Sequence, residues 1–334
     1  MAERAAQIDA FLTASGWADA ARAPLPGDAS FRRYCRLTRG AAATMLMDAP
    51  PPQEDVRPYL AVARHLRTLD LSAPTILAAE EETGLLLIED FGDGTFTRLL
   101  AKGEDEYALY AMAIDVLIAL HRRFDAAHTP WLPPYDDTRL LNEAALLVDW
   151  YLPAITGQPT PAALRAEYLD LWRPLFPVAR AVPRSLVLRD YHVDNLMRLD
   201  GRDGIAACGL LDFQDAVLGP VTYDLVSLLE DSRREIAPDL VSAMYARYAA
   251  AFPAVDRAAL DASYVVLGAQ RHCKVIGIFT RLCRRDGKPR YLAHIPRLWR
   301  LLDGNFRHPV LAPVKAWLDR YIPREKRRIP AETP

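Results

Sequence analysis

A polar loop set between two apolar segments constrains the fold of this chain more than any other feature. The stretch LVLRDYHVDNLM, at residues 186–197, begins with three apolar residues that predict a short buried strand. Residues 189–195, RDYHVDN, are mostly polar, and the apolar pattern then resumes at Leu196 and Met197. A loop held at both ends by buried strands is well suited to fixing catalytic groups in place.

The two parts of the chain differ in their apolar pattern. Residues 24–48 alternate and contain turn signals, which predicts two or three short antiparallel strands. A helix is expected at about 54–69, and the segment 75–92 predicts a strand, a turn and a strand. Beyond Gly92 the pattern is mainly helical, with apolar-periodic runs near residues 104–123, 139–152, 161–180, 222–230, 238–250, 256–282 and 290–302.

These patterns predict an α+β protein with a small β-rich N-terminal lobe, residues 1–90, and a larger helical C-terminal lobe, residues 91–334. A cleft is expected between the lobes, with the segment 88–94 as their junction. The N-terminus predicts an amphipathic helix through Ile8, Phe11 and Leu12.

Composition excludes several classes of partner. The net charge of −2 gives no general attraction to nucleic acid. The longest apolar run, YALYAMAIDVLIAL, is shorter than the roughly 20 residues that a membrane span needs, so it predicts a core helix. The four cysteines form no Cys-x-x-Cys pair, which favours reduced thiols in a cytoplasmic protein. No feature indicates an obligatory protein partner.

Three polar residues predict a metal site with an adjacent base. Asp190 and Asn195 lie in the loop, and Asp212 follows the next strand. A turn at Asp200-Gly201 would fold that strand back and bring Asp212 near Asn195. Oxygen ligands of this kind suit Mg²⁺, which takes further ligands from water and phosphates. Asp190 would then orient and deprotonate a hydroxyl, although Asp190 and Asp212 are also residue types common in turns.

The segments RDYHVDN and LDFQD together resemble the catalytic loop and metal-binding segment of protein-kinase-like small-molecule kinases. The resemblance implies a bilobal protein-kinase-like fold and ATP as co-substrate. It also implies Asp190 as the base and Asn195 and Asp212 as the Mg²⁺ ligands. His192 matches the D-x-H pattern of aminoglycoside phosphotransferases, and Asp224 would brace the loop from the next helix.

Further segments resemble a narrower family, the bacterial N-acetylmuramate/N-acetylglucosamine 1-kinases of cell-wall sugar recycling. They are spread over about residues 24–300 and read GDASFRRY, LMDAPP, LIEDFG, LDFQDAVLGPVTYDLVSLLED and GIFTRLCRRDGK. This resemblance implies ATP-dependent phosphorylation of an amino sugar at its anomeric hydroxyl, in the cytoplasm. An aminoglycoside or other small-alcohol phosphotransferase, and a non-catalytic nucleotide-binding pseudokinase, are the alternatives.

The chain departs from the kinase pattern on the third strand, where Met47 stands in place of a phosphate-binding lysine. Arg32 and Arg33 are the nearest cations, and neighbouring strand residues point to opposite faces. Arg33 shares its face with Phe31, Cys35 and Leu37, the more apolar set, so we expect Arg33 to point inward and bind the phosphates. The alternative is that both arginines are exposed on a solvated strand.

Other nucleotide contacts are expected from the loop PGDAS, including Ser30, which would cover the phosphates. By resemblance, the Glu89 carbonyl and the Phe91 N–H would bind adenine.

Substrate contacts are expected on both sides of the loop. Arg271 and Lys274 lie on a basic helical segment and could bind the lactyl carboxylate of N-acetylmuramate, or could belong to a solvated face. His192 would either brace the loop or contact the sugar, and Asp215 faces either the sugar or the surface. Gln214 and Glu143 complete the predicted substrate-binding set.

Overall fold

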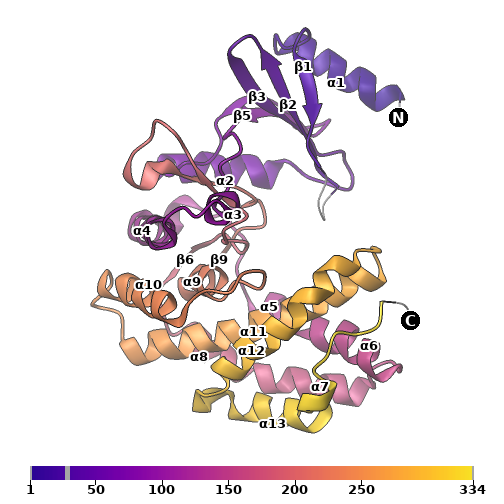
Figure 1. Cartoon of the computed structure of the whole chain (residues 1–334), viewed down its shortest axis with the longest axis vertical. Helices are drawn as coiled ribbons and strands as arrows, with labels where there is room; N and C mark the ends of the chain where they lie inside the picture. Colours follow the sequence, from indigo (N-terminus) through magenta and orange to yellow (C-terminus); the bar gives the residue numbers. More distant parts are fainter. Residues whose placement is uncertain (1, 27–30, 333–334) are drawn as a thin grey trace. The chain divides into compact units, whose positions relative to one another are not determined.

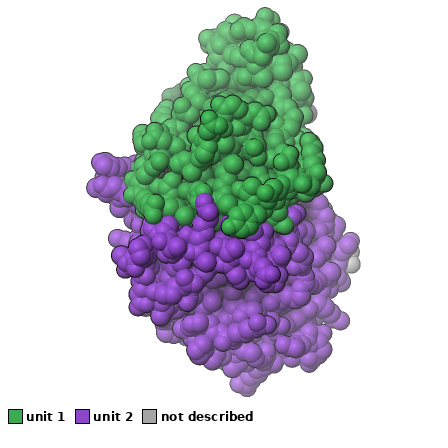
Figure 2. Space-filling model, turned by 60° about the vertical axis from the view of Figure 1, so that its left-hand side comes forward, with its two compact units in different colours: residues 1–123, 193–216 green, residues 124–192, 217–334 purple. Residues whose placement is uncertain are grey.

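The computed structural model describes residues 2–26 and 31–332. They divide into two compact units, which are coloured separately in Figure 2. Unit 1 comprises residues 1–123 and 193–216, and unit 2 comprises residues 124–192 and 217–334. This division differs from the boundary predicted at residue 90, because residues 91–123 and 193–216 group with the N-terminal sheet. The chain passes between the units at His192–Val193, within the polar loop.

Unit 1 contains an antiparallel sheet with the strand order β1-β2-β3-β5-β4. The strands are β1 (Ala21–Pro24), β2 (Arg33–Arg39), β3 (Ala42–Asp48), β4 (Ile76–Glu80) and β5 (Leu85–Glu89). The N-terminal helix α1 (Ala2–Ala14) lies along this sheet (Figure 1). Phe11 and Leu12 pack into one cluster with Leu37, Leu46 and Leu87, which shows that the apolar stripe of α1 covers one face of the sheet.

The rest of unit 1 is formed by helices and one hairpin. The helices are α2 (Arg57–Thr68), α3 (Phe96–Ala101) and α4 (Glu106–Arg123), and the hairpin joins β7 (Leu196–Arg198) to β8 (Cys208–Leu210) through the short helix η3 (Gly204–Ala207). Helix α2 buries Tyr59, Val62 and Leu66, as the sequence predicts. Helix α4 contains the long apolar run and buries most of its apolar side chains between Leu109 and Leu120. No described helix is long and apolar enough to cross a membrane.

Unit 2 is mainly helical and is organised around α11 (Arg257–Arg284), a helix of 28 residues (Figure 1). Helix α11 packs against α5, α8, α9 and α12, and the π-helical turn η2 continues α5. The remaining bounds are α5 (Asp137–Leu146), η2 (Leu147–Tyr151), α6 (Leu152–Thr156), α7 (Ala162–Trp172), α8 (Leu175–Ala179), α9 (Thr222–Leu229), α10 (Pro238–Ala250), α12 (Ile295–Asn305) and α13 (Ala312–Tyr321). Short turns of 3₁₀ helix are η1 (Ala126–His128), η4 (Pro289–His294), η5 (Pro309–Leu311) and η6 (Arg324–Lys326).

The strands that flank the polar loop belong to two different ladders. β6 (Arg184–Val187) pairs with β9 (Val217–Pro220) in unit 2, whereas β7 pairs with β8 in unit 1. The turn predicted at Asp200-Gly201 is confirmed by the β7–β8 hairpin. The β6–β9 pair was not predicted. It holds the start of the polar loop, because β6 ends one residue before Leu188.

Candidate active site

The start of the polar loop is clamped by a buried acid on α9. Asp224 accepts hydrogen bonds from the backbone N–H groups of Leu188, at 2.6 Å, and Arg189, at 2.9 Å. Arg189 has a φ of 71°, in the left-handed region that a residue with a side chain rarely adopts. The two hydrogen bonds oppose this strain and fix the backbone directly before Asp190. The predicted bracing role of Asp224 is confirmed.

Asp190 is an ionised carboxylate inside unit 2. Burial raises its pKa, but the positive charges of Lys274 and Arg271 act in the opposite direction, and the net pKa lies below the ordinary aspartate value. A carboxylate kept ionised can accept a hydrogen bond from a hydroxyl and later its proton. The role of Asp190 as the base remains a prediction, and this environment is suited to it.

A second chain of hydrogen bonds reaches the same backbone from α11. Arg271 donates through Nη2 to Ser227 Oγ at 2.7 Å, and Ser227 donates to the Arg189 carbonyl at 3.3 Å. Arg271 and Lys274 are both buried, so the alternative of a solvated basic face is wrong for these two residues. The Ser227 contact was not predicted, because Ser227 lies 44 residues from Arg271.

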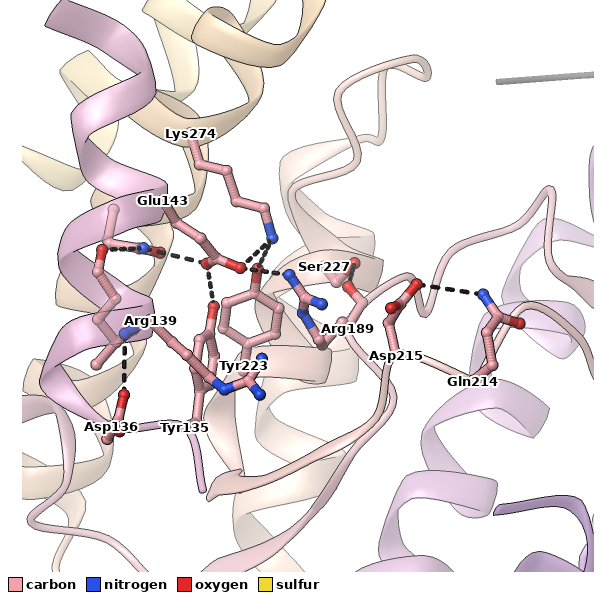
Figure 3. Close-up of polar contacts among 12 residues, drawn as sticks. Tyr135, Asp136, Arg139, Glu143, Arg189, Gln214, Asp215, Tyr223, Ser227 and Lys274 are labelled. Atoms are coloured by element: carbon pink, nitrogen blue, oxygen red, sulfur yellow. Dashed lines mark hydrogen bonds and ion pairs between the residues drawn. The ribbon is translucent and has the colours of Figure 1, made fainter. Parts of the chain in front are cut away.

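Glu143 on α5 is the centre of a buried charged cluster (Figure 3). Its carboxylate accepts from Lys274 Nζ at 2.9 Å, from the Arg189 guanidinium and from the Tyr135 hydroxyl. Lys274 also donates to the Tyr223 hydroxyl at 3.1 Å. Burial raises the pKa of Glu143, but the charges of Lys274 and Arg189 outweigh it and lower the pKa to about 2. The single carboxylate of Glu143 therefore offsets only part of the positive charge of Lys274 and Arg189 in unit 2.

His192 ends the part of the loop that belongs to unit 2. It is buried, and its Nε2 lies 3.2 Å from Nη1 of Arg233. Burial and the charge of Arg233 lower its pKa, so the imidazole is neutral at pH 7. This contact supports the bracing interpretation of His192; the sugar contact remains a prediction.

Asn195 and Asp212 lie together in unit 1, as the hairpin predicts. Nδ2 of Asn195 is 3.5 Å from Oδ2 of Asp212, and the Leu211 N–H donates to the Asn195 carbonyl at 3.0 Å. Asp212 has a φ of 56°, and 44% of its side chain is exposed. The strained backbone sits at an accessible carboxylate, a combination that is often found at functional positions.

The donor set at this pair fits a hard divalent cation. It offers amide and carboxylate oxygens, which Mg²⁺ prefers. Within residues 2–26 and 31–332, no group of three or more His, Cys, Asp and Glu side chains could hold a metal. A cation here would therefore take its other ligands from water and from a bound phosphate.

Gln214 and Asp215 extend the polar surface beside Asp212. Gln214 Nε2 donates to Asp212 Oδ1 at 2.9 Å and to Asp215 Oδ2 at 3.3 Å. These contacts place Gln214 next to the candidate metal ligand. Contacts of Gln214 and Asp215 with a sugar remain predictions.

The expected orientation of the two arginines is wrong. Arg32 lies near Asp212, with Nη2 3.6 Å from Oδ1, and near Glu54, with Nε 3.5 Å from Oε2, whereas Arg33 is exposed. The parity argument assumed that the apolar face of β2 looks toward the nucleotide. That face, with Cys35 and Leu37, instead packs in the cluster covered by α1.

The segment after β5 is held by charged contacts from two sides. Arg36 donates to Asp90 Oδ2 at 2.6 Å and to Oδ1 at 3.1 Å. The carboxylate of Glu89 accepts from the Thr75 hydroxyl at 2.8 Å and from the Arg202 guanidinium. These partners were not predicted. They fix the backbone whose carbonyl and N–H groups are predicted to bind adenine.

A cavity of about 480 Å³ adjoins this segment within unit 1 and is lined in part by Glu89 and Phe91. The Phe91 ring packs on Gly209, where an added Cβ would lie 2.7 Å from a ring carbon. Glycine is therefore required at this point of β8 for the ring to approach the strand this closely. Ser30, the remaining predicted nucleotide contact, lies outside the described residues.

The small antiparallel sheet, the helical remainder and the Asp/Asn/Asp set define the class: a phosphotransferase with a protein-kinase-like fold. Residues 22–261 match the model of the phosphotransferase enzyme family, and the chain belongs to this family. It is 42% identical to an N-acetylmuramate/N-acetylglucosamine kinase of Caulobacter vibrioides, over 98% of this chain and 99% of the relative. A kinase of the same name from Pseudomonas aeruginosa is 40% identical, over 90% and 89% of the two chains.

Among solved structures, choline kinase LicA from Streptococcus pneumoniae is similar with a TM-score of 0.61. The match covers 91% of this chain and 100% of that one, at 11% sequence identity. This likeness supports the fold, and the chain is an ATP-dependent kinase by its family.

Proposed function

We propose that this protein transfers the γ-phosphoryl group of ATP to the anomeric hydroxyl of N-acetylmuramate and N-acetylglucosamine, giving sugar 1-phosphates for the recycling of cell-wall sugars. The observation that carries the proposal is the identity of 42% with a kinase named for these two sugars over nearly the whole of both chains. The likeness to choline kinase, at 11% identity, concerns the fold alone. We place the reaction in the cytoplasm, because ATP is available there.

In the proposed reaction, Asp190 orients the sugar hydroxyl and accepts its proton. The new bond joins the anomeric oxygen to the γ-phosphorus while the bond to the β–γ bridging oxygen breaks, and ADP leaves. Asn195 and Asp212 would hold Mg²⁺, which when bound offsets the negative charge of the phosphates. The Asp224 clamp keeps the base in a fixed position, and positioning contributes most of the catalysis when the transition state is loose.

The choice of hydroxyl agrees with the state of the base. The charges of Lys274 and Arg271 lower the pKa of Asp190 against the effect of burial, and this makes the carboxylate a weak base. An anomeric hydroxyl is more acidic than a primary one, because the ring oxygen withdraws electron density. A weak base therefore suits the 1-position better than the 6-position.

For the sugar, we propose His192, Gln214, Asp215, Glu143, Arg271 and Lys274 as the binding residues. Arg271 has the strongest support among the cations, because its Nε and Nη1 atoms are buried and make no hydrogen bond within the described residues. Lys274 is already neutralised by Glu143. An acidic sugar substituent, such as the lactyl carboxylate of N-acetylmuramate, would satisfy a buried guanidinium.

The test uses the purified chain with ATP, Mg²⁺ and a set of acceptors: N-acetylmuramate, N-acetylglucosamine, its reduced alditol, kanamycin and choline. We expect both amino sugars to consume ATP and the alditol to be inert, because it keeps the 6-hydroxyl but lacks an anomeric centre. Phosphorus NMR of the product should show coupling to H1. A 6-phosphate, or faster reaction with kanamycin or choline, would overturn the proposal; no reaction with any acceptor would indicate a pseudokinase.

A further inference from the structure

The third strand of the sheet lacks the cation that kinases use to bind the phosphates. Met47 on β3 is fully buried and stands directly opposite Tyr34 in the β2–β3 register. Residues in direct register share a face of the sheet, so Tyr34 and Met47 lie on the face opposite to the one that α1 covers. Arg32, two residues before Tyr34, brings a positive charge to this face next to Asp212.

Two carboxylates lie near the Arg32 guanidinium and balance its charge, but two of its nitrogen atoms have no hydrogen-bond partner within the described residues. Its side chain is 11% exposed, and the carboxylates of Glu54 and Asp212 approach at 3.5 and 3.6 Å. At these distances the acids balance the charge, but Nε and Nη1 make no hydrogen bond within the described residues. A guanidinium has five N–H donors, and buried donors without acceptors are uncommon in proteins. Two nitrogen atoms of Arg32 are therefore available to a further acceptor, such as a phosphate oxygen.

The aromatic side chains near Arg32 are neutral, so they do not cancel its positive charge. Burial raises the pKa of Tyr34 to about 12, although the charge of Arg32 acts against it, so its phenol stays neutral at physiological pH. Tyr59 stacks on Phe213 with ring centroids 4.9 Å apart, and both rings are buried. Such a setting has little water, which strengthens the attraction between a cation and a phosphate.

We propose that Arg32 binds phosphate oxygens of ATP, from the residue that precedes β2, in place of a lysine on β3. Glu54 positions the guanidinium, as a helix glutamate positions the lysine in other kinases. Near Asp212, Arg32 lowers the repulsion between this carboxylate and the incoming phosphates. The inference rests on the proposed use of ATP, and it assigns a role to a residue other than Arg33, which was expected to have it.

Arg33 provides a matched control. It is the next residue, carries the same charge and is exposed at the start of β2. Arg32→Gln and Arg33→Gln make the same chemical change, so a difference between them reports position rather than net charge.

The experiment measures binding by calorimetry with two probes, the ATP analogue AMP-PNP with Mg²⁺, and adenosine. We expect Arg32→Gln to weaken AMP-PNP binding at least tenfold, a loss that corresponds to about 1.4 kcal/mol. Adenosine has no phosphates, so its affinity should stay within twofold. Arg33→Gln should leave both affinities within twofold of the wild type.

Three outcomes would overturn the inference: an AMP-PNP loss below fivefold in Arg32→Gln, an equal loss in Arg33→Gln, or an equal loss for adenosine. If Arg32→Gln does not fold, Arg32→Lys keeps the charge but not the planar fork, and we expect it to lose at least threefold for AMP-PNP alone. Unchanged AMP-PNP affinity in that variant would equally reject the role. These measurements need no sugar, so they remain decisive if the proposed acceptor is wrong.

Discussion

Asp190 in unit 2 and Asp212 in unit 1 are both carboxylates of the predicted site, and their surroundings differ. Asp190 is half-buried, and the charges of Lys274 and Arg271 lower its pKa against the effect of burial. Asp212 is 44% exposed, and Arg32 and Asn195 approach it at 3.6 and 3.5 Å. The difference matches the two predicted roles, because a base needs a fixed ionised oxygen, whereas a metal ligand must exchange its contacts for a cation.

Each unit has a site residue whose backbone lies in the left-handed region of φ, and the hydrogen bonds around the two residues differ. Arg189, with a φ of 71°, precedes Asp190 and is held by Asp224 and Ser227. Asp212 itself has a φ of 56°. Each such residue costs on the order of 1–3 kcal/mol. In unit 2 the strained residue is Arg189, next to Asp190, and its hydrogen bonds offset the cost. In unit 1 the strained residue is the carboxylate residue Asp212 itself.

The largest expected effect comes from removing the charge of Asp190. Asp190→Asn should lower turnover by about 10²- to 10⁴-fold, the usual contribution of a general base. AMP-PNP affinity should change by less than threefold, because Asp190 is proposed to contact the sugar hydroxyl. The measurements are steady-state turnover and calorimetry, with Asp203→Asn, an exposed acid before η3, as the control. Near-normal turnover would remove Asp190 from the mechanism.

The next effect tests whether the buried charges of unit 2 depend on one another. Glu143→Gln leaves Lys274 and Arg189 without their buried partner, which should cost about 3–5 kcal/mol of unfolding free energy. Asp149→Asn is the control, because it removes an ion pair with Arg165 whose side chains are 33% and 42% exposed. An exposed pair contributes about 0–1 kcal/mol.

Urea denaturation of both variants gives the comparison. If Glu143→Gln and Asp149→Asn lose the same small amount of stability, water reaches the Glu143 cluster and its charges do not depend on one another.

A smaller effect is expected at the candidate metal site. Asp212→Ala should weaken Mg²⁺-dependent AMP-PNP binding by at least about tenfold, because a charged oxygen ligand contributes more than 1.4 kcal/mol to cation binding. Adenosine binding should persist, and Asp203→Ala should behave as the wild type. Titration with Mn²⁺, followed by electron paramagnetic resonance, measures the cation directly. Unchanged Mn²⁺ affinity would show that the metal binds elsewhere.

The sequence predicted the parts of the site that depend on local structure. Asn195 and Asp212 meet because one hairpin joins them, and a turn signal marks that hairpin. The choice of Arg33 over Arg32 was wrong, because the sequence does not show which face of β2 is covered by α1. The contact between Glu143 and Lys274 joins residues 131 positions apart, and no local pattern indicates such a pairing.

The smallest expected effect concerns the pH dependence of Asp190. Loss of activity on the acidic side follows protonation of the base, so a lowered pKa places this loss below the ordinary aspartate range of about 3.9. Lys274 exerts the largest of the charge effects that lower this pKa. Lys274→Met removes that charge and leaves Glu143 less neutralised, and both changes raise the pKa of Asp190. The acidic limb of kcat/KM should therefore move to higher pH in the variant. Wild type and variant are compared with the same ATP and sugar, so titration of the substrates cancels. An acidic limb that stays in place would show that Lys274 does not act on the base, and a limb that moves to lower pH would reject Asp190 as the titrating group.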